Sequence, residues 1–336
     1  MKGRKMGMGL FSSEVPIISI EFGNPIRVIY GGKRKDKKVV IKNFALETLP
    51  MDVFQGSQLN NSNYLQEVLR AILKSFKVKT AKTLISIPAQ NVIVRFFNFP
   101  YMPENELRES LRWELERYIP LAPEDINYDI QIVDVIDRGE TKEIKVMLVA
   151  VPKEIVNPYM EIIKNLNLEP ELVDVSVFSA VRILLMNRKE IPKGNTLYLY
   201  SHDNVAEFVV AKENQPLFFR STVMEEWNPQ EEVDDLTKSF MLEDFVRKIQ
   251  ESVNFFYMQF PEEHIDQVWI TGSNSKNKDF VDLLEAVLNV PTEALPRVTS
   301  DFNNFLIVNL KKQEKNFLED LSSWVVPVGL FFWERL

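Results

Sequence analysis

Apolar and polar residues recur along this chain of 336 residues with two periods, one typical of strands and one typical of helices. Near the start, the shorter period indicates three strands, at 15–19, 26–30 and 39–44. The two turns that join them both contain glycine. The longer period predicts a helix between Leu65 and Phe76, and a further strand is expected at 84–88. The first segment of the chain therefore has the predicted order β-β-β-α-β.

The middle segment, residues 92–175, has the predicted order β-α-β-β-α-β. Its first helix carries a buried stripe of residues spaced four, four and three apart, namely Leu107, Leu111, Leu115 and Tyr118. The strand that follows alternates apolar with polar residues, as in Tyr128-Asp129-Ile130-Gln131-Ile132, which is typical of a half-buried strand. We expect this segment to be a self-contained module with its own four-stranded sheet.

The second half shows a comparable series of elements. Three strands are expected first, at 196–200, 205–210 and 216–222. After an acidic stretch at 225–235, which has the composition of a solvated linker, a long helix is predicted around Phe245 to Phe256. A strand at 268–271 and another helix follow. The order β-β-β-α-β is that of the ribonuclease-H-like unit from which actin-type domains are built, although many α/β folds begin in the same way.

Composition narrows the classes of function. The formal net charge of −8 argues against an electrostatic grip on nucleic acid, which needs a basic face. The absence of cysteine excludes disulfides, thiolate metal sites and cysteine nucleophiles, and it fits a cytosolic chain. His202 and His264 are far apart in sequence, and no metal-binding or nucleophile motif occurs. We therefore predict no catalytic residue and no metal site.

Both ends of the chain have a distinct composition. Residues 1–13 hold three cations and a short apolar patch, which does not make a signal peptide. We expect a flexible basic tail there, either disordered or in contact with an anionic membrane. The apolar run from Trp324 to Trp333 is shorter than the about 20 residues that a membrane span needs, and we expect it to be buried.

The residue patterns of several segments resemble sequence motifs of the PilM family, which are actin-like cytoplasmic proteins of type IV pilus machines. The family's W-E-x-E-x-Y-I-P helix end is matched by Trp113, Glu114, Glu116, Tyr118, Ile119 and Pro120. The acidic and aromatic residues that follow in the family stand here in swapped order, as Tyr128-Asp129. The run Lys145–Glu154 is close to V-L-L-V-A-x-x-K-E, and Val326–Leu330 is similar to the closing A-x-G-L-A. The resemblance runs from about residue 14 to 331.

This resemblance implies an α/β protein of actin-like fold, in which a ribonuclease-H-like unit is duplicated and carries an inserted subdomain. The first lobe is expected at 14–91 and is completed by 176–194, with the inserted subdomain at 92–175. The second lobe is expected at 195–336, with a reduced upper subdomain at about 225–260.

An actin-type ATPase holds its nucleotide between the lobes on backbone turns that need glycine and a carboxylate. The turns here are eroded. The first keeps Glu21, Gly23 and Asn24, whereas the second, Tyr200-Ser201-His202, has no glycine. The third keeps Gly272 and Ser273. We expect a cleft without catalysis or cofactor, in which Glu21 is a solvated turn residue. The alternative is a nucleotide-binding ATPase of the actin and sugar-kinase superfamily, with residual ATP–magnesium binding at those five residues.

Members of the PilM family hold the cytoplasmic N-terminal tail of a single-span membrane protein, PilN, in a groove between the inserted subdomain and its host domain. The resemblance implies a non-catalytic adaptor of an inner-membrane assembly platform, cytoplasmic and peripheral to the inner membrane, which also contacts other platform or motor proteins. Its expected groove residues are Arg95, Phe97, Trp113 and Tyr118. Trp113 and Tyr118 could instead simply pack their helix on its sheet. A cytoplasmic piece of a type II secretion platform is a further alternative.

Overall fold

A six-stranded mixed sheet forms the core of the first lobe, in the order β10-β6-β1-β2-β3-β16. Its strands are β1 (Val15–Glu21), β2 (Ile26–Lys33), β3 (Val39–Glu47), β6 (Lys82–Ile87), β10 (Glu169–Val175) and β16 (Leu306–Val308). The structure is a computed structural model that describes residues 15–55, 58–137, 139, 141–186, 192–213, 215–224, 233–295, 305–310 and 314–335. The predicted basic tail at 1–13 therefore lies outside the described residues.

Helices cover both faces of this sheet. Helices α1 (Ser62–Phe76) and α3 (Lys153–Asn165) lie on one face, where the ring of Tyr159 packs 4.4 Å from that of Phe22. Helices α4 (Ser176–Met186) and α8 (Val325–Gly329) lie on the other, where Ser19 Oγ donates a hydrogen bond of 2.5 Å to the carbonyl of Pro327. Asn61 caps α1 by accepting a hydrogen bond from the amide of Tyr64.

The second lobe repeats the same topology. Its sheet has the order β13-β12-β11-β14-β15, formed by β11 (Asn195–His202), β12 (Val205–Lys212), β13 (Gln215–Val223), β14 (Gln267–Thr271) and β15 (Thr292–Ala294). In both lobes three antiparallel strands are followed by two strands parallel to the first. Helices α5 (Asp235–Gln259) and α6 (Lys278–Leu288) pack together on this sheet. The duplication confirms the predicted actin-like α/β fold.

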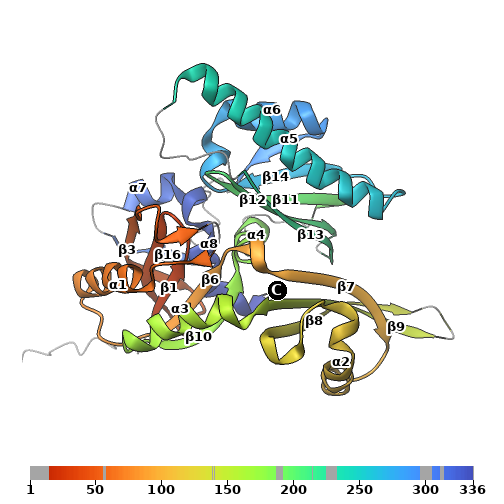
Figure 1. The fold of residues 1–336 in the computed structure, drawn as a ribbon, viewed down its shortest axis with the longest axis horizontal. Coiled ribbons are helices and arrows are strands. Elements are labelled where there is room, and N and C mark those ends of the chain that lie inside the picture. The colour runs from red at the N-terminus through yellow and green to blue at the C-terminus, as the bar shows by residue number, and fades with distance from the viewer. Residues whose placement is uncertain are drawn as a thin grey trace, which may run out of the picture.

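The inserted module is smaller than predicted. It holds β7 (Ile93–Pro100), α2 (Glu104–Tyr118), β8 (Ile126–Asp137) and β9 (Lys142–Pro152), and its sheet has three strands, in the order β7-β9-β8. The prediction of a four-stranded sheet over 92–175 is wrong, because β10 pairs in parallel with β6. The helix α3 also belongs to the first lobe, since its buried residues join the first-lobe core. Figure 1 shows the module extending away from both lobes.

The C-terminal segment also departs from the prediction of a second lobe at 195–336. Strand β16 pairs with β3 in the first-lobe sheet, and the apolar residues from Trp324 to Phe332 are buried in the first-lobe core. The segment is therefore buried, as expected, but in the first lobe. Its apolar residues complete the cover of the α4 face, because α4 packs on β10 and β6 and α8 packs on β1, β2 and β6.

The expected upper subdomain at about 225–260 is not a separate unit in the part that the structure describes. Residues 225–232 lie outside the described residues. The helix α5 belongs to the second-lobe core, because Phe245, Ile249 and Phe256 are fully buried there.

Short elements complete the described chain, namely β4 (Phe54–Gln55), β5 (Gln58–Leu59), η1 (Ala89–Asn91), η2 (Pro123–Asp125), η3 (Ser273–Lys276), α7 (Glu314–Glu319), η6 (Leu321–Trp324) and η7 (Leu330–Arg335). Among the described helices, none combines the length and the apolarity that a transmembrane span requires.

Candidate functional site

Two spaces between structural units are candidates for a binding site, and the first is the interlobe cleft. As predicted from the turns, Glu21, Gly23 and Asn24 lie opposite the β11–β12 turn, and they line a cavity with His202 and Asp203. The cavity has a volume of about 110 Å³. Pockets for small molecules and cofactors are usually about 300–1,000 Å³, so this cavity is too small for a nucleotide.

Glu21, Arg27 and Tyr200 close the cleft. Glu21 Oε1 accepts a hydrogen bond from the hydroxyl of Tyr200 in the other lobe, and Glu21 Oε2 lies 3.4 Å from Arg27 Nη1. All three side chains are buried. Burial alone would lower the pKa of Arg27, but the combined interactions with Glu21, Tyr200 and Asp203 outweigh burial and raise the pKa. Burial and the Glu21 charge also raise the pKa of Tyr200, so the phenol keeps its proton. The expectation that Glu21 is solvated is wrong.

The other predicted cofactor residues are occupied by structural contacts. The Asn24 side chain accepts a hydrogen bond of 2.8 Å from the amide of Leu49 and donates one of 3.0 Å to its carbonyl. Ser273 Oγ accepts a hydrogen bond of 3.3 Å from the amide of Asp203. Gly272 has a φ of +95°, and a Cβ there would lie 2.2 Å from the carbonyl oxygen of Ser201. Gly272 is therefore required by the approach of two backbone segments, whatever the cleft binds.

Gly23 differs from Gly272, because a Cβ at Gly23 would meet no atom closer than 3.9 Å. Packing therefore does not require a glycine at this turn. Among the described residues, no group of three or more His, Asp or Glu side chains is placed to hold a metal ion.

Glu207 makes a second polar connection between the lobes. It lies on β12 and is fully buried, and its Oε1 accepts a hydrogen bond of 2.9 Å from the amide of Ala89 at the start of η1 in the first lobe. Burial raises the pKa of Glu207 to about 7, although the Ala89 amide opposes the shift.

Sequence reasoning missed Arg27, Tyr200 and Glu207 as the residues that close the cleft. A signal existed for two of them, because Arg27 and Glu207 are single charges inside otherwise apolar strands, IRVIY and AEFVVA. A charged residue is rarely buried without a partner, so such a position indicates a buried polar contact.

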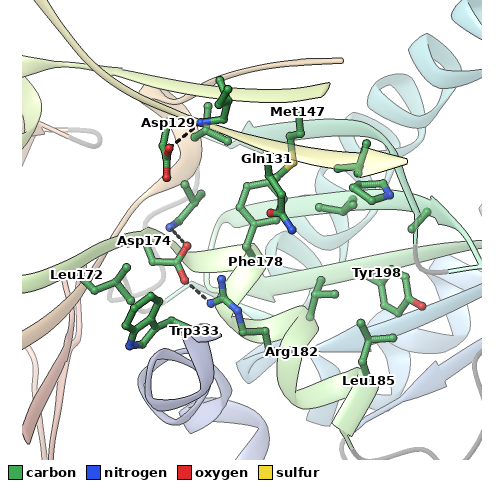
Figure 2. Close-up of a pocket in the computed structure, with 18 of the residues that line it drawn as sticks. Asp129, Gln131, Met147, Leu172, Asp174, Phe178, Arg182, Leu185, Tyr198 and Trp333 are labelled. Atoms are coloured by element: carbon green, nitrogen blue, oxygen red, sulfur yellow. Dashed lines mark hydrogen bonds and ion pairs between the residues drawn. The ribbon is translucent and has the colours of Figure 1, made fainter. Parts of the chain in front are cut away.

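The second place is a groove between the module and the first lobe. Its hollow has a volume of about 400 Å³. One wall is formed by β8 and β9, and the other by β10 and α4, with the end closed by second-lobe strands and Trp333. Figure 2 shows Phe178, Met147 and Leu172 pointing into this space. A second hollow of about 490 Å³ adjoins it, because Asp129, Val149 and residues 173–175 line both.

One face of the module sheet packs on α2, and the opposite face is turned toward the first lobe and lines the groove. On β9, Val146, Leu148 and Ala150 face α2 and form the module core, whereas Met147 and Val151 join the first-lobe core. The sheet is thus apolar on both faces, as strands buried on two sides are. Strand β8 adds polar residues to the lining, because Asn127, Asp129 and Gln131 line the hollows together with Tyr128, Ile130, Ile132 and Val133. The groove therefore has an apolar floor and a polar rim.

Both edge strands of the groove have an unpaired side. Within the described strands, β8 pairs with β9 alone and β10 with β6 alone. Each strand therefore has one edge without a neighbouring strand, which is the feature that an added strand uses. Side chains hold some backbone groups of these strands, namely the amide and carbonyl of Ile130 and the amide of Val175.

A buried ion pair lies on the β10–α4 wall. Asp174 Oδ2 accepts hydrogen bonds from Arg182 and from Ser179 Oγ, the latter of 2.7 Å. The Asp174 and Arg182 side chains are only 11% and 10% exposed. Figure 2 shows the pair directed along the wall, so that it does not cross the groove. A lone arginine in the apolar sequence of α4 could have indicated this contact.

The structure does not place the four predicted partner-binding residues in the groove. Phe97 and Tyr118 come together, with rings stacked 3.9 Å apart, but on the α2 side of the module sheet. Arg95 is exposed. Trp113 is 84% exposed on the outer face of α2 and therefore does not pack that helix on its sheet. None of the four lines either hollow, so assigning them to the groove was wrong. Whether they contact another pilus protein remains a prediction.

Comparisons with known proteins agree with this architecture. The solved structure of a PilM–PilN type IV pilus biogenesis complex matches with a TM-score of 0.77 at 20% identity, covering 95% of this chain and 98% of that chain. A protein of actin-like ATPase fold from Bacteroides thetaiotaomicron matches with a TM-score of 0.48 at 10% identity, covering 88% and 97%. The ethanolamine utilization protein EutJ from Carboxydothermus hydrogenoformans matches with a TM-score of 0.49 at 7% identity, covering 94% and 88%.

A search of curated proteins gave no match. The sequence pattern of one family, the type IV pilus assembly protein PilM, matches residues 23–223, which is more than half of the chain. The chain therefore belongs to the PilM family of type IV pilus assembly proteins.

Proposed function

We propose that this protein is a non-catalytic adaptor of a type IV pilus assembly platform, and that it holds the cytoplasmic N-terminal tail of a PilN-like membrane protein in the groove between β8 and β10. The protein would then be cytoplasmic and peripheral to the inner membrane through that partner. The similar structure named above is that of a PilM–PilN complex, which supports the class of partner.

The groove itself is the observation that carries the proposal. An extended peptide can add to a free strand edge by main-chain hydrogen bonds while alternate side chains enter apolar pockets. Strands β8 and β10 supply the free edges, and Phe178, Leu172 and Met147 supply the apolar floor. The groove therefore suits an extended segment with aliphatic side chains at alternate positions.

The interlobe cleft supports the non-catalytic part of the proposal. A nucleotide would have to displace the buried contacts among Glu21, Arg27 and Tyr200, and each broken charged contact costs about 1.5–3 kcal/mol. Its phosphates would also approach Glu21 and Glu207, the two buried carboxylates nearby. We expect calorimetric titration with Mg-ATP to give no heat of binding at micromolar concentrations. Binding in that range would favour the ATPase alternative.

Titration with a fluorescent synthetic tail tests the groove. The probe is the N-terminal cytoplasmic segment of the PilN-like protein from the same genome. Val173 is 36% exposed on β10 and lines both hollows. Val173→Arg should therefore weaken binding by about 10- to 100-fold, because it fills the groove with a desolvated charge.

The matched control is Val135→Arg. Val135 is 50% exposed on β8 and lines neither hollow, so the same substitution there should leave the affinity within about two-fold. Trp113→Ala should also leave it unchanged. Equal loss in the Val173 and Val135 variants, or no binding to the unmodified protein, would contradict the proposal.

A further inference from the structure

The end of the first-lobe sheet farthest from the cleft carries a distinct surface. Strand β1 runs from Val15 at this end to Glu21 at the cleft, and register places Lys33 beside Val15 and Lys82 beside Ile17. Glu169, at the start of β10, lies beside Lys82. The β2–β3 hairpin, the last turn of α1, the start of β6 and the end of α3 therefore meet at one end of the lobe.

This end is strongly basic although the chain as a whole has a net charge of −8. Six exposed lysines from three loops and helix ends form what we call the basic face, namely Lys35, Lys37, Lys74, Lys77, Lys79 and Lys164. None of the six forms an ion pair with a carboxylate in the described part of the chain. Among the acidic residues of this end, Asp36 pairs with Arg34, Glu171 with Lys82 and Glu334 with Lys33, and Glu169 forms no ion pair with the six lysines. The charge of the face is therefore not neutralised within the protein.

A shallow hollow of about 470 Å³ lies in the basic face, between the ends of α1 and α3. Its charged lining residues are Arg70, Lys74, Lys77 and Lys79, and no carboxylate lines it. The remaining lining is small and neutral, with Leu73, Val78 and Asn167. The hollow therefore offers several ammonium groups to one anionic group at the surface.

Two exposed apolar side chains lie beside the cations. Val15 is 49% exposed at the start of β1, and Trp333 is 37% exposed, with Lys33 Nζ placed 5.9 Å from its ring centroid. An aromatic ring next to lysines is the combination that membrane–water interfaces favour, since tryptophan prefers the headgroup level. The basic face is thus bordered by the type of residue that enters a bilayer interface.

We infer that the basic face docks on the surface of an anionic lipid bilayer, with phospholipid phosphates among the lysines and Trp333 at headgroup depth. Attraction of lysines to an anionic leaflet is additive and needs no fixed geometry, which suits flexible lysines on separate turns. A nucleic-acid surface is less well matched, because the rest of this acidic chain would be repelled by a long polyanion. Lysines also contact nucleic-acid phosphates, so a DNA duplex is the competing partner in the test.

The docked orientation fits the position of the groove. Lys164 of the basic face also lines the second hollow, and Trp333 lines the first. The groove would then open beside the bilayer, while the second lobe points away from it. The inference does not depend on the proposed tail binding, because a protein-free vesicle is sufficient to test it.

Vesicle flotation of the full-length protein is the experiment. The probes are vesicles of phosphatidylcholine alone and of phosphatidylcholine mixed with phosphatidylglycerol, without any protein partner, at low and at high salt. We expect binding to the anionic vesicles alone and its loss in high salt, because the attraction is screened. The triple variant Lys35→Glu, Lys74→Glu, Lys79→Glu should bind roughly 100-fold less.

A control variant with the same change in net charge distinguishes the effect of the basic face from the effect of the overall charge of the protein. The control carries the substitutions Lys238→Glu, Arg247→Glu and Lys278→Glu. These three residues are exposed on α5 and α6 of the second lobe. This control should float like the unmodified protein, and both variants should keep the unmodified circular dichroism spectrum and tail affinity. Equal loss in both variants would overturn the inference. So would absence of binding to anionic vesicles, or tighter binding to a labelled DNA duplex than to vesicles.

Discussion

The interlobe cleft and the groove beside the module each contain an arginine–carboxylate pair, but the cleft is closed and the groove is open. Each lies at the ends or edges of strands and contains one buried pair of arginine and carboxylate, Arg27 with Glu21 and Arg182 with Asp174. In the cleft, Glu21 also reaches Tyr200 of the other lobe, which leaves about 110 Å³. In the groove, the pair stays on one wall and leaves about 400 Å³.

The difference lies in the further contact of the carboxylate, because both pairs are formed within the first lobe. Glu21 also accepts a hydrogen bond from Tyr200 of the second lobe, and this contact joins the two walls of the cleft. Asp174 accepts its hydrogen bonds from groups of its own wall, Arg182, Ser179 and Val175, and the groove stays open. The following experiments test this distinction, from the largest expected effect to the smallest.

The largest effect is expected from Arg27→Leu. This change leaves the carboxylate of Glu21 unpaired in a buried cleft, and breaking a buried pair costs about 3–5 kcal/mol. Urea unfolding followed by circular dichroism measures the loss of stability. The double variant Glu21→Leu, Arg27→Leu should recover most of that loss. If the single variant is as stable as the unmodified protein, the cleft is not held by this pair.

The second effect concerns pH and Glu207. Its pKa of about 7 in the folded protein is above its ordinary value of 4.5, so protonation favours the folded state. Its contribution is complete below pH 4.5 and is lost as the pH rises through about 7. The loss is about 3 kcal/mol, and Glu207→Gln should not show it. Urea unfolding of both proteins across this range measures the difference, and parallel pH profiles would contradict the assignment.

The third effect separates two glycines of the predicted phosphate turns. Gly272→Ala places a methyl group against Ser201 at a positive φ, so it should destabilise the protein by about 2 kcal/mol or more. Gly23→Ala meets no close atom and should change stability by less than about 1 kcal/mol. Thermal unfolding gives both values. Equal effects would mean that Gly23 is held by a contact that the structure does not show.

The smallest effect is expected from Arg182→Leu. Asp174 keeps its hydrogen bonds from Ser179 and from the amide of Val175, so the loss should be about 1–2 kcal/mol. Urea unfolding beside Arg27→Leu compares the two pairs directly. A loss as large as that of Arg27→Leu would remove the distinction between a carboxylate that also contacts the second lobe and one whose contacts all lie on one wall.

Much of the fold was predictable because its elements carry strong local periods. The stripe from Leu107 to Leu115 and the apolar strands of both lobes gave the correct element types and order. Strand partners were less predictable. The sequence of β10, EPELVDV, suits either sheet, and its pairing with β6 depends on α3 carrying the chain back over the first lobe. The same holds for β16, which is distant in sequence from β3.

The candidate site was predictable in one respect and hidden in another. The turns at Glu21 and at His202–Asp203 do meet between the lobes, as their places after the strands imply, and Ser273 contacts Asp203. The groove residues were not found, because a partly exposed valine such as Val173 has no sequence signature that distinguishes it from Val135. Trp113 drew attention as a large aromatic residue, although its side chain lies far from the groove lining.

By itself, the sequence determined the types and order of the strands and helices, because periodicity and turn residues are local properties. Its resemblance to the PilM family implied the actin-like body, the inserted module and the eroded phosphate turns. Only the tertiary structure decided that Glu21 is closed in by Arg27 and Tyr200, that β10 leaves the module for the first lobe, and that the module stands off far enough to leave a groove. These features depend on contacts between residues distant in the chain, and such contacts are set by packing rather than by local preference.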